Sequence, residues 1–301
     1  MPTLAPKPCR IVIALVAVLA CARPSTLPVP KTSSTQSPDN GSPQSIQREN
    51  NSPKFWQLSP TSEDQRYSTV ITTTIQQKVG EVTVFDSVTT RAQYSISFTH
   101  SATEVLLSGL IQAFTAQAGT RIGTGTAISS LPVAFTGQIQ NHELQLNILN
   151  SNRLSTASLP CEMPATTALT AVQASLFVTP LQLQTGMTWQ DSLSSTSCSG
   201  NFPLNLTILR TYKVLGQSFI NNIPVIAIDL TEKTLSAGEG SQGQHRIIIN
   251  GQAAGSGQLY LDTSTGALIS FSSDTQTTLQ IQSSGRTQQF LQNSKQVITR
   301  I

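Results

Sequence analysis

The sequence predicts a mainly β protein with one short helix, built as a large curved antiparallel sheet or half-barrel from two similar halves. Apolar and polar residues alternate along many segments, which is the period of a half-buried strand. Short glycine-containing segments separate them, as in hairpins. Charged residues make up only 11% of the chain, whereas Ser, Thr and Gln are abundant. This composition is typical of an extracytoplasmic β protein with polar, uncharged solvent faces.

The clearest alternation lies in residues 82–98, where Ala92, Tyr94 and Ile96 share one face. An unbroken strand of this length would span about 55 Å at about 3.3 Å per residue. Since that exceeds a usual strand, we expect a bulge or turn near residues 86–87.

Other segments predict further strands by the same alternation. They cover residues 67–77, 104–118, 186–196, 204–214, 224–230, 245–250, 257–262, 267–272 and 277–282. Residues 104–118 also fit a helix, but Gly109, Thr115 and the β-rich surroundings favour a strand. The turns at 78–81, 262–266 and 283–285 would join neighbouring strands antiparallel. Gly255-Ser256-Gly257 fits either a turn or a point where small residues allow a strand to curve.

One segment, residues 164–177, favours a helix. Leu169, Val172 and Leu176 are at helical spacing, and Pro164 suits the first turn.

The N-terminus has the layout of a secretory signal. Lys7 and Arg10 precede an apolar run at residues 11–20, which is too short to span a bilayer. The run ends in Val18-Leu19-Ala20-Cys21, which resembles the lipobox of bacterial lipoproteins.

The resemblance implies a signal peptide at 1–20 that is cleaved before Cys21. It also implies that fatty acyl chains such as palmitate, attached to Cys21, anchor the chain at the periplasmic face or outer membrane of a cell envelope. The alternatives are an ordinary signal cut elsewhere, for example after Ala22, and a single membrane-spanning anchor.

Residues 21–60 are rich in Pro, Ser, Thr, Asn and Gln, and predict a disordered, lipid-anchored tether. Its root-mean-square reach would be about 35 Å. A glycosylated stalk has a similar composition. The β-rich globular domain is expected at 61–301, with halves at 61–155 and 182–301 joined by 156–181.

Charge gives no case for nucleic acid as a partner. Removal of the signal peptide takes away Lys7 and Arg10, and with them most of the excess of 18 cations over 15 anions. Nucleic-acid binding would need a concentrated basic face.

The cysteines predict one disulfide bond. Cys9 lies in the signal peptide and Cys21 is the proposed anchor, which leaves Cys161 and Cys198 as a pair in an oxidising compartment. A loop of this size would stabilise the fold by about 3–4 kcal/mol. The alternative is a metal or redox pair, but neither cysteine lies in a Cys-x-x-Cys pattern.

No catalytic constellation stands out, so we expect no enzyme, no cofactor and no metal. His100, His142 and His245 are isolated and read as exposed or edge residues. Asp191 and Asp229 are the only acidic residues in apolar settings. They are expected to be buried beside an arginine or exposed on a strand face.

In the C-terminal half, Gly186-Met-Thr-Trp-Gln-Asp191 resembles a Gly-x-x-Trp-x-Asp/Glu pattern of uncharacterised β-rich envelope lipoproteins. Later segments fit the same pattern: residues 212–216, 225–228, 255–257 and 261–268. The hairpin at 262–266 also resembles those of half-barrels that carry lipoproteins or lipids across the periplasm. The resemblance implies no established activity.

Two functions follow as hypotheses. The first is a non-catalytic extracytoplasmic lipoprotein that binds a lipid or other apolar ligand in a curved sheet, for which an apolar cavity of several hundred Å³ would be evidence. The alternative is a structural or interaction module of the cell envelope, displayed on its tether to an envelope protein or a polysaccharide. A hydrolase is third, and the oligomeric state stays open.

Overall fold

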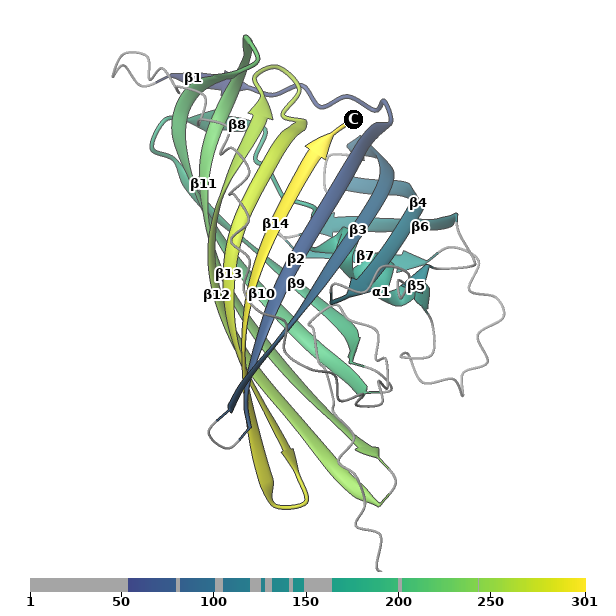
Figure 1. The fold of residues 1–301 in the computed structure, drawn as a ribbon. Helices are drawn as coiled ribbons and strands as arrows, with labels where there is room; N and C mark the ends of the chain where they lie inside the picture. Colours follow the sequence, from purple (N-terminus) through teal and green to yellow (C-terminus); the bar gives the residue numbers. More distant parts are fainter. Residues whose placement is uncertain are drawn as a thin grey trace, which may run out of the picture.

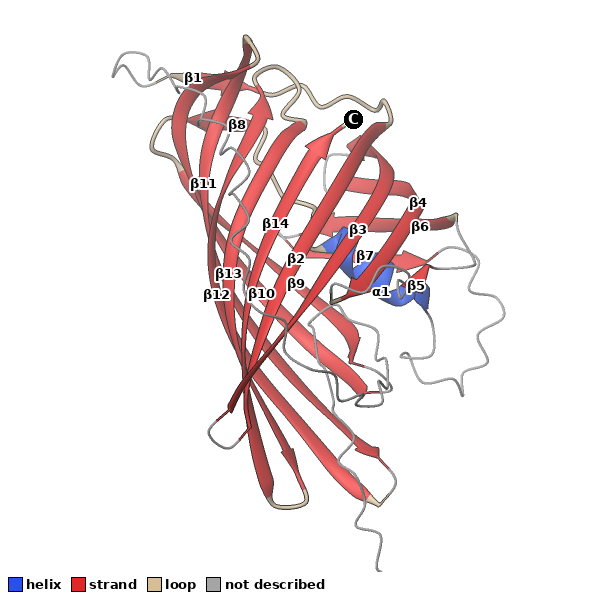
Figure 2. Ribbon diagram, in the orientation of Figure 1, coloured by secondary structure: helices blue, strands red, loops and turns tan. Residues whose placement is uncertain are grey.

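The structure is a computed structural model that describes residues 54–79, 82–100, 105–119, 126–127, 132–140, 143–148, 164–199, 202–242 and 244–301. Within these ranges, strands account for most residues and a single helix is present (Figure 2). The predicted fold class, a mainly β protein with one short helix in a large curved sheet, is confirmed.

The elements follow the chain in this order: β1 (Phe55–Gln57), β2 (Gln65–Val79), β3 (Val82–His100), β4 (Val105–Ala118), β5 (Thr126–Ala127), β6 (Val133–Gln140), β7 (Glu143–Ile148), α1 (Pro164–Gln173), β8 (Gln182–Gln184), β9 (Thr188–Ser199), β10 (Phe202–Ile220), β11 (Ile223–Gln242), β12 (His245–Asp262), β13 (Leu268–Ser283) and β14 (Arg286–Arg300).

The main sheet is a closed ring of strands. Its order is β3-β2-β14-β13-β12-β11-β10-β9-β7-β6-β4, and β3 also pairs with β4; β5 is attached to β4, and β1 and β8 form a separate pair. Neighbours are antiparallel except β7 and β9, which are parallel over two residue pairs. The pairing of β14 with β2 joins the two expected halves into one sheet.

Alternation sorts the side chains between the inside and the outside of the ring. Along β10, Leu204, Leu206 and Ile208 are buried, whereas Asn205 and Thr207 are exposed. Because strand side chains alternate between the two faces, this pattern gives β10 an apolar inner row and a mixed outer row, in which Leu209 is also exposed.

Two apolar clusters divide the interior. We call the end that contains α1, β1 and β8 the covered end. It holds the larger cluster, which includes residues of the helix and of β3, β6, β10 and β14, and the helix itself contacts β3, β4, β7 and β9. We call the opposite end, towards the β2–β3, β11–β12 and β13–β14 hairpins, the narrow end (Figure 1). Its cluster consists of Ile75, Val88, Leu204, Ile247, Ile249, Leu279, Ile281 and Phe290.

Buried hydroxyl and amide side chains lie between the two clusters. They come from five strands of the ring and comprise Thr73, Thr90, Thr234, Ser236, Thr277 and Gln292.

Small residues let the strands approach one another closely towards the narrow end. A Cβ atom added at Gly251 would lie 2.3 Å from the Ser236 Oγ and 2.8 Å from the Leu279 Cδ1. Ser236 and Leu279 lie on the strands either side of β12, directly opposite Gly251. Gly255 and Gly257 also lie inside β12, so this segment is a curved strand interior and its interpretation as a turn is wrong.

Several predicted strands were too short. The segments 245–250 and 257–262 are parts of one strand, β12, and the segments 267–272 and 277–282 belong to β13. The turns at 262–266 and 283–285 are confirmed by the antiparallel pairs that flank them.

The expected break near residues 86–87 is also wrong. β2 and β3 stay in register from Val82 to Ile96, and the register shift in β3 lies between Gln93 and Tyr94, against β4. The long strand needs no break because the strands of a ring can coil along their whole length.

The helix is confirmed, but it ends four residues before the expected position. Ser175 and Leu176 close the last turn with bonds to the carbonyls of Val172 and Gln173. The Ser175 hydroxyl donates to the Ala171 carbonyl, 2.9 Å away, a side-chain bond that competes with further helix. After the helix, Val178 bonds Asp191 of β9 and Phe177 contacts Arg210 of β10.

Candidate functional site

An apolar cavity of about 130 Å³ lies at the covered end of the ring. Buried lining residues such as Tyr94 and Ile96 mark its inner part, whereas Leu181 is 47% exposed at its mouth. The described lining residues include no charged side chain: they are Leu58, Pro60, Gln65, Tyr67, Tyr94, Ile96, Phe98, Val105, Ile139, Ser175, Leu176, Phe177, Val178, Thr179, Leu181, Leu261, Thr265, Gly266, Ala267 and Leu268.

Residues 54–60, which we call the N-terminal strap, cover part of this cavity. β1 pairs with β8, placing Trp56 opposite Leu183. The Leu58 N–H donates to the Leu181 carbonyl, and the Ser59 N–H donates to the Ser264 carbonyl, each at 2.8 Å. Leu58 is only 4% exposed, so an N-terminal side chain forms part of the cavity wall.

Gly266 meets the strap from the β12–β13 hairpin. Its φ of +73° favours glycine, and a Cβ atom there would lie 2.7 Å from the Leu58 Cδ1. This position therefore requires glycine for both conformation and space.

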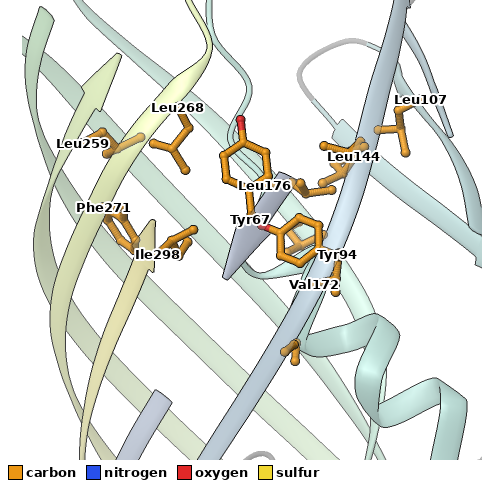
Figure 3. Close-up of a cluster of buried hydrophobic side chains, with 14 of the residues drawn as sticks. Tyr67, Tyr94, Leu107, Leu144, Val172, Leu176, Leu259, Leu268, Phe271 and Ile298 are labelled. Atoms are coloured by element: carbon orange, nitrogen blue, oxygen red, sulfur yellow. The ribbon is translucent and has the colours of Figure 1, made fainter. Parts of the chain in front are cut away.

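Two tyrosines bring hydroxyl groups to the cavity. The Tyr67 and Tyr94 rings are tilted against each other with centroids 5.5 Å apart, and Leu176 lies beside them (Figure 3). The Tyr67 hydroxyl donates to the Gln65 side-chain oxygen. The Tyr94 hydroxyl is buried and has no hydrogen bond among the described residues.

The Ser175 hydroxyl faces the Tyr94 hydroxyl and lowers its pKa, although the two groups do not reach hydrogen-bond geometry. The Ser175 hydroxyl already donates to the Ala171 carbonyl and accepts from the Gln296 side-chain amide at 3.1 Å. Burial is the main reason that the pKa of Tyr94 is raised, and Tyr67 raises it further. Burial likewise raises the pKa of Tyr67 to about 12. Both hydroxyls therefore stay protonated and able to donate at neutral pH.

A buried ion pair lies beside the cavity. The Arg210 Nε and Nη2 donate to the two carboxylate oxygens of Asp191 at 2.8 and 3.0 Å. The Tyr212 hydroxyl donates to the same carboxylate at 2.7 Å. Arg210 and Asp191 are 1% and 2% exposed, so this pair is shielded from water.

The ion pair holds residues 174–181, which we call the α1 tail. The Val178 N–H donates to the Asp191 carboxylate at 3.3 Å, and the Trp189 indole N–H donates to the Val178 carbonyl at 2.9 Å. The Arg210 guanidinium carbon lies 5.1 Å from the centroid of the Phe177 ring, in cation–π geometry. Since the α1 tail contributes Ser175 to Thr179 to the lining, the ion pair fixes one wall of the cavity.

Glu232 faces Arg210 from the neighbouring strand β11. Burial raises the pKa of Glu232, and the positive charge of Arg210 opposes this rise. Its carboxylate accepts a hydrogen bond from the Thr234 hydroxyl at 3.3 Å. The Asp191 carboxylate, the Arg210 guanidinium, the Tyr212 hydroxyl and the Glu232 carboxylate each bond another group of the protein, which is the arrangement of a structural network.

Two of the larger grooves elsewhere on the ring span four strands each. One, of about 720 Å³, is lined by Thr, Ser, Asn, Gln, Asp and Lys side chains of β2, β12, β13 and β14. The other, of about 440 Å³, is similarly polar and spans β10 to β13. Neither brings apolar side chains together as the covered end does.

The described residues confirm both expectations for the acidic pair. Asp191 is buried beside an arginine, and Asp229 lies on a strand face, where it accepts a bond from the Gln258 amide at 3.2 Å. His245 is exposed and bonds the Ser284 hydroxyl. Among the described residues, no group of three or more His, Cys, Asp or Glu side chains could hold a metal.

Other predicted residues fall outside the description. The signal peptide, Cys21, most of the tether, His142 and Cys161 lie outside the described residues. Cys198 is described as a backbone position in β9, opposite Pro203. The anchor and the Cys161–Cys198 bridge therefore stay predictions. In the described part of the chain, no helix has the length and apolarity needed to cross a membrane.

Sequence reasoning missed the tyrosine hydroxyls and Arg210. Tyr67 and Tyr94 had been assigned to alternating strands, where each inward tyrosine also brings a hydroxyl into the core. Arg210 interrupts the inward row of β10, between Ile208 and Tyr212. A charged residue in an apolar row is a usable signal, but its partner Asp191 follows only once the β9–β10 register is known.

Comparison with family models finds no match, and comparison with curated proteins finds none either. Among solved structures, OccK2 (OpdF) of Pseudomonas aeruginosa is 8% identical, with 82% of this chain and 99% of that chain covered and a TM-score of 0.27. A loop L8 deletion mutant of OmpT, an outer membrane protein of Vibrio cholerae, is 9% identical over 78% and 99%, with a TM-score of 0.21. Scores this low transfer neither function nor location.

Proposed function

We propose that this chain is a non-catalytic, exported lipoprotein that binds an apolar ligand at the covered end of its ring. The observation that carries the proposal is the uncharged, mostly apolar cavity between the N-terminal strap, the α1 tail and the β12–β13 hairpin. Its volume is close to that of engineered apolar cavities of about 150 Å³, which stay dry and bind benzene. It is smaller than the several hundred Å³ that a whole lipid requires, so it accommodates part of one chain.

The outward face of β13 supports a domain held at a membrane by its N-terminus. Strands that face lipid carry apolar outward side chains, whereas the outward residues of β13 are mostly Ser, Thr and Gln, with Asp274 among them. In the proposal, acylated Cys21 supplies the membrane attachment and the ring remains in water. The site of attachment is the cell envelope.

The anchor is tested by mass measurement of the full-length chain purified from its own membrane. The expected result is a mature chain that begins at acylated Cys21, with loss of both acylation and membrane association in Cys21→Ala. Recovery of unacylated protein cut at another position would contradict the anchor.

The ligand site is tested with the same full-length protein and the apolar fluorophore N-phenyl-1-naphthylamine. Ala267 is buried and lines the cavity, so Ala267→Leu should fill it and weaken fluorophore binding. Ala237→Leu adds the same atoms on the exposed outer face of β11 and serves as the control. Equal binding by both variants and the parent would sink the proposed site.

A further inference from the structure

The Tyr94 hydroxyl is the feature of the cavity that the proposed function leaves unexplained. It is buried and makes no hydrogen bond among the described residues, and Tyr94 is one of the residues that line the cavity. Buried hydroxyls normally have a partner, because one without a partner loses its bonds to water and gains nothing in return. A phenylalanine would pack equally well here without that loss.

The two nearby hydroxyl groups already donate hydrogen bonds to other protein atoms. The Tyr67 hydroxyl donates to Gln65, and the Ser175 hydroxyl donates to the Ala171 carbonyl. Among the described residues that line the cavity, Tyr94 is the one with a buried side-chain oxygen that makes no hydrogen bond. A ligand with a single hydrogen-bond acceptor near its buried end would accept a hydrogen bond from the Tyr94 hydroxyl.

The charge around the cavity restricts the acceptor. The described lining residues include no lysine, arginine or histidine. The cation that acts on Tyr67 is Arg300, which is exposed near the end of β14 and is not a lining residue. Burying an ionised carboxylate without a cation is costly, so an uncharged oxygen fits this site and a fatty-acid anion does not.

We propose that the ligand is an uncharged lipid whose ester or ketone oxygen accepts a hydrogen bond from the Tyr94 hydroxyl. This inference rests on the proposed function, since it names the chemical class of the ligand for the same cavity. The alkyl part would lie against Leu176, Leu261 and Leu268 and continue through the mouth beside Leu181.

The test compares three probes that share a ten-carbon chain, on the full-length protein: decane, methyl decanoate and decanoate. Each is measured by its displacement of N-phenyl-1-naphthylamine. Methyl decanoate should bind about fivefold to tenfold more tightly than decane, which is the usual worth of one hydrogen bond. Decanoate should bind most weakly.

The variant Tyr94→Phe removes only the donor. It should bind methyl decanoate no better than decane, while its affinity for decane stays unchanged. Tyr260→Phe is the matched control, because that hydroxyl donates to Gln258 away from the cavity and its loss should leave all three affinities unchanged. The melting temperature of Tyr94→Phe should equal or exceed that of the parent.

The outcomes separate the two proposals. Equal affinity of the parent for decane and methyl decanoate would overturn the role of Tyr94 and leave the apolar site standing. Preference for decanoate that disappears in Arg300→Gln would overturn the uncharged class. If neither the fluorophore nor any of the three probes binds, the proposed function itself fails. The comparison in the parent protein decides the matter even if Tyr94→Phe does not fold.

Discussion

The two ends of the ring are closed in different ways. At the narrow end, side chains of the ring strands themselves fill the interior, and β12 uses Gly251 to bring its neighbours into contact. At the covered end, elements that are not part of the ring fill it: α1, the α1 tail and the N-terminal strap. The cavity and the buried ion pair both lie at the covered end.

This difference shows how a ring of strands can keep space for a ligand. Strands that close on each other leave only as much room as their side chains require, and small residues remove even that. Inserted elements pack against the ring strands along interfaces, and side chains can leave part of such an interface unfilled. The Asp191–Arg210 pair holds the α1 tail against β9 and β10, so the packing of the covered end depends on a few specific bonds.

The largest expected effect comes from breaking that pair. Asp191→Ala leaves Arg210 buried without its partner, and should lower the free energy of unfolding by about 3–5 kcal/mol in urea titrations. The double variant Asp191→Leu/Arg210→Met removes both charges and should recover much of that loss. The exposed pair Glu239–Arg246 provides the control, and Glu239→Ala should have little effect. A similar loss in the single and double variants would show that the pair does not act as a unit.

At the narrow end, added volume should be destabilising. Gly251→Val places atoms where the Ser236 hydroxyl and Leu279 already lie, and overpacking of this kind costs about 1–3 kcal/mol. Ala254→Val adds volume on the outward face of the same strand and should be nearly neutral. Fluorophore binding at the covered end should be unchanged in both. Loss of binding in Gly251→Val would show that the two ends are coupled.

Protonation of Glu232 should make the covered end sensitive to pH. Since burial raises its pKa above 4.5 in the folded chain, the folded state holds the proton more tightly than the unfolded state. The contribution of Glu232 to stability is therefore greatest below about pH 4.5 and declines as pH rises through the folded pKa.

Glu232→Gln should thus gain stability relative to the parent as pH rises, in urea titrations between pH 4 and 8. Glu239→Gln should show the opposite trend, because hydrogen bonding to Arg246 lowers the pKa of Glu239. Parallel curves for Glu232→Gln and the parent would exclude a buried, titrating Glu232.

The smallest effect is expected at the β12–β13 hairpin, where Asp262 accepts bonds from Ser264 and Thr265. These bonds outweigh desolvation and lower its pKa to about 2. Because the side chain is partly exposed, Asp262→Ala should cost less than about 1 kcal/mol at neutral pH. The difference should vanish as pH falls from about 4 to 2, which thermal unfolding at each pH will measure. A constant difference would mean that the charge is irrelevant.

Much of the fold could be predicted because its signals are local. The hairpin turns at 262–266 and 283–285 and the helix at Leu169 and Val172 follow from residue type and spacing. Strand lengths could not, because Gly251 and Gly255 look like breaks until their neighbours across the sheet are known. Thr73 is buried while Thr72 and Thr74 are exposed, and the three residues are identical in type.

The candidate site was only partly predictable for the same reason. Trp189 and Asp191 stood out as a motif, and the structure shows that they hold the α1 tail. The cavity itself is formed by segments far apart in sequence, such as Leu58, Tyr94 and Leu268. Their meeting depends on ring closure, which residue patterns along one strand do not encode.

The N-terminal strap has a mechanical consequence. A pull on the chain ahead of Lys54 reaches the ring through β1, which pairs with β8 over only three residues, whereas β2 is fifteen residues long and pairs on both edges. Tension would therefore peel β1 away long before it strained the ring. Since the adjoining Leu58 forms part of the cavity wall, further tension would next act on that wall, through the Leu58–Leu181 bond. Tension on the N-terminus and opening of the cavity are thus linked through the N-terminal strap.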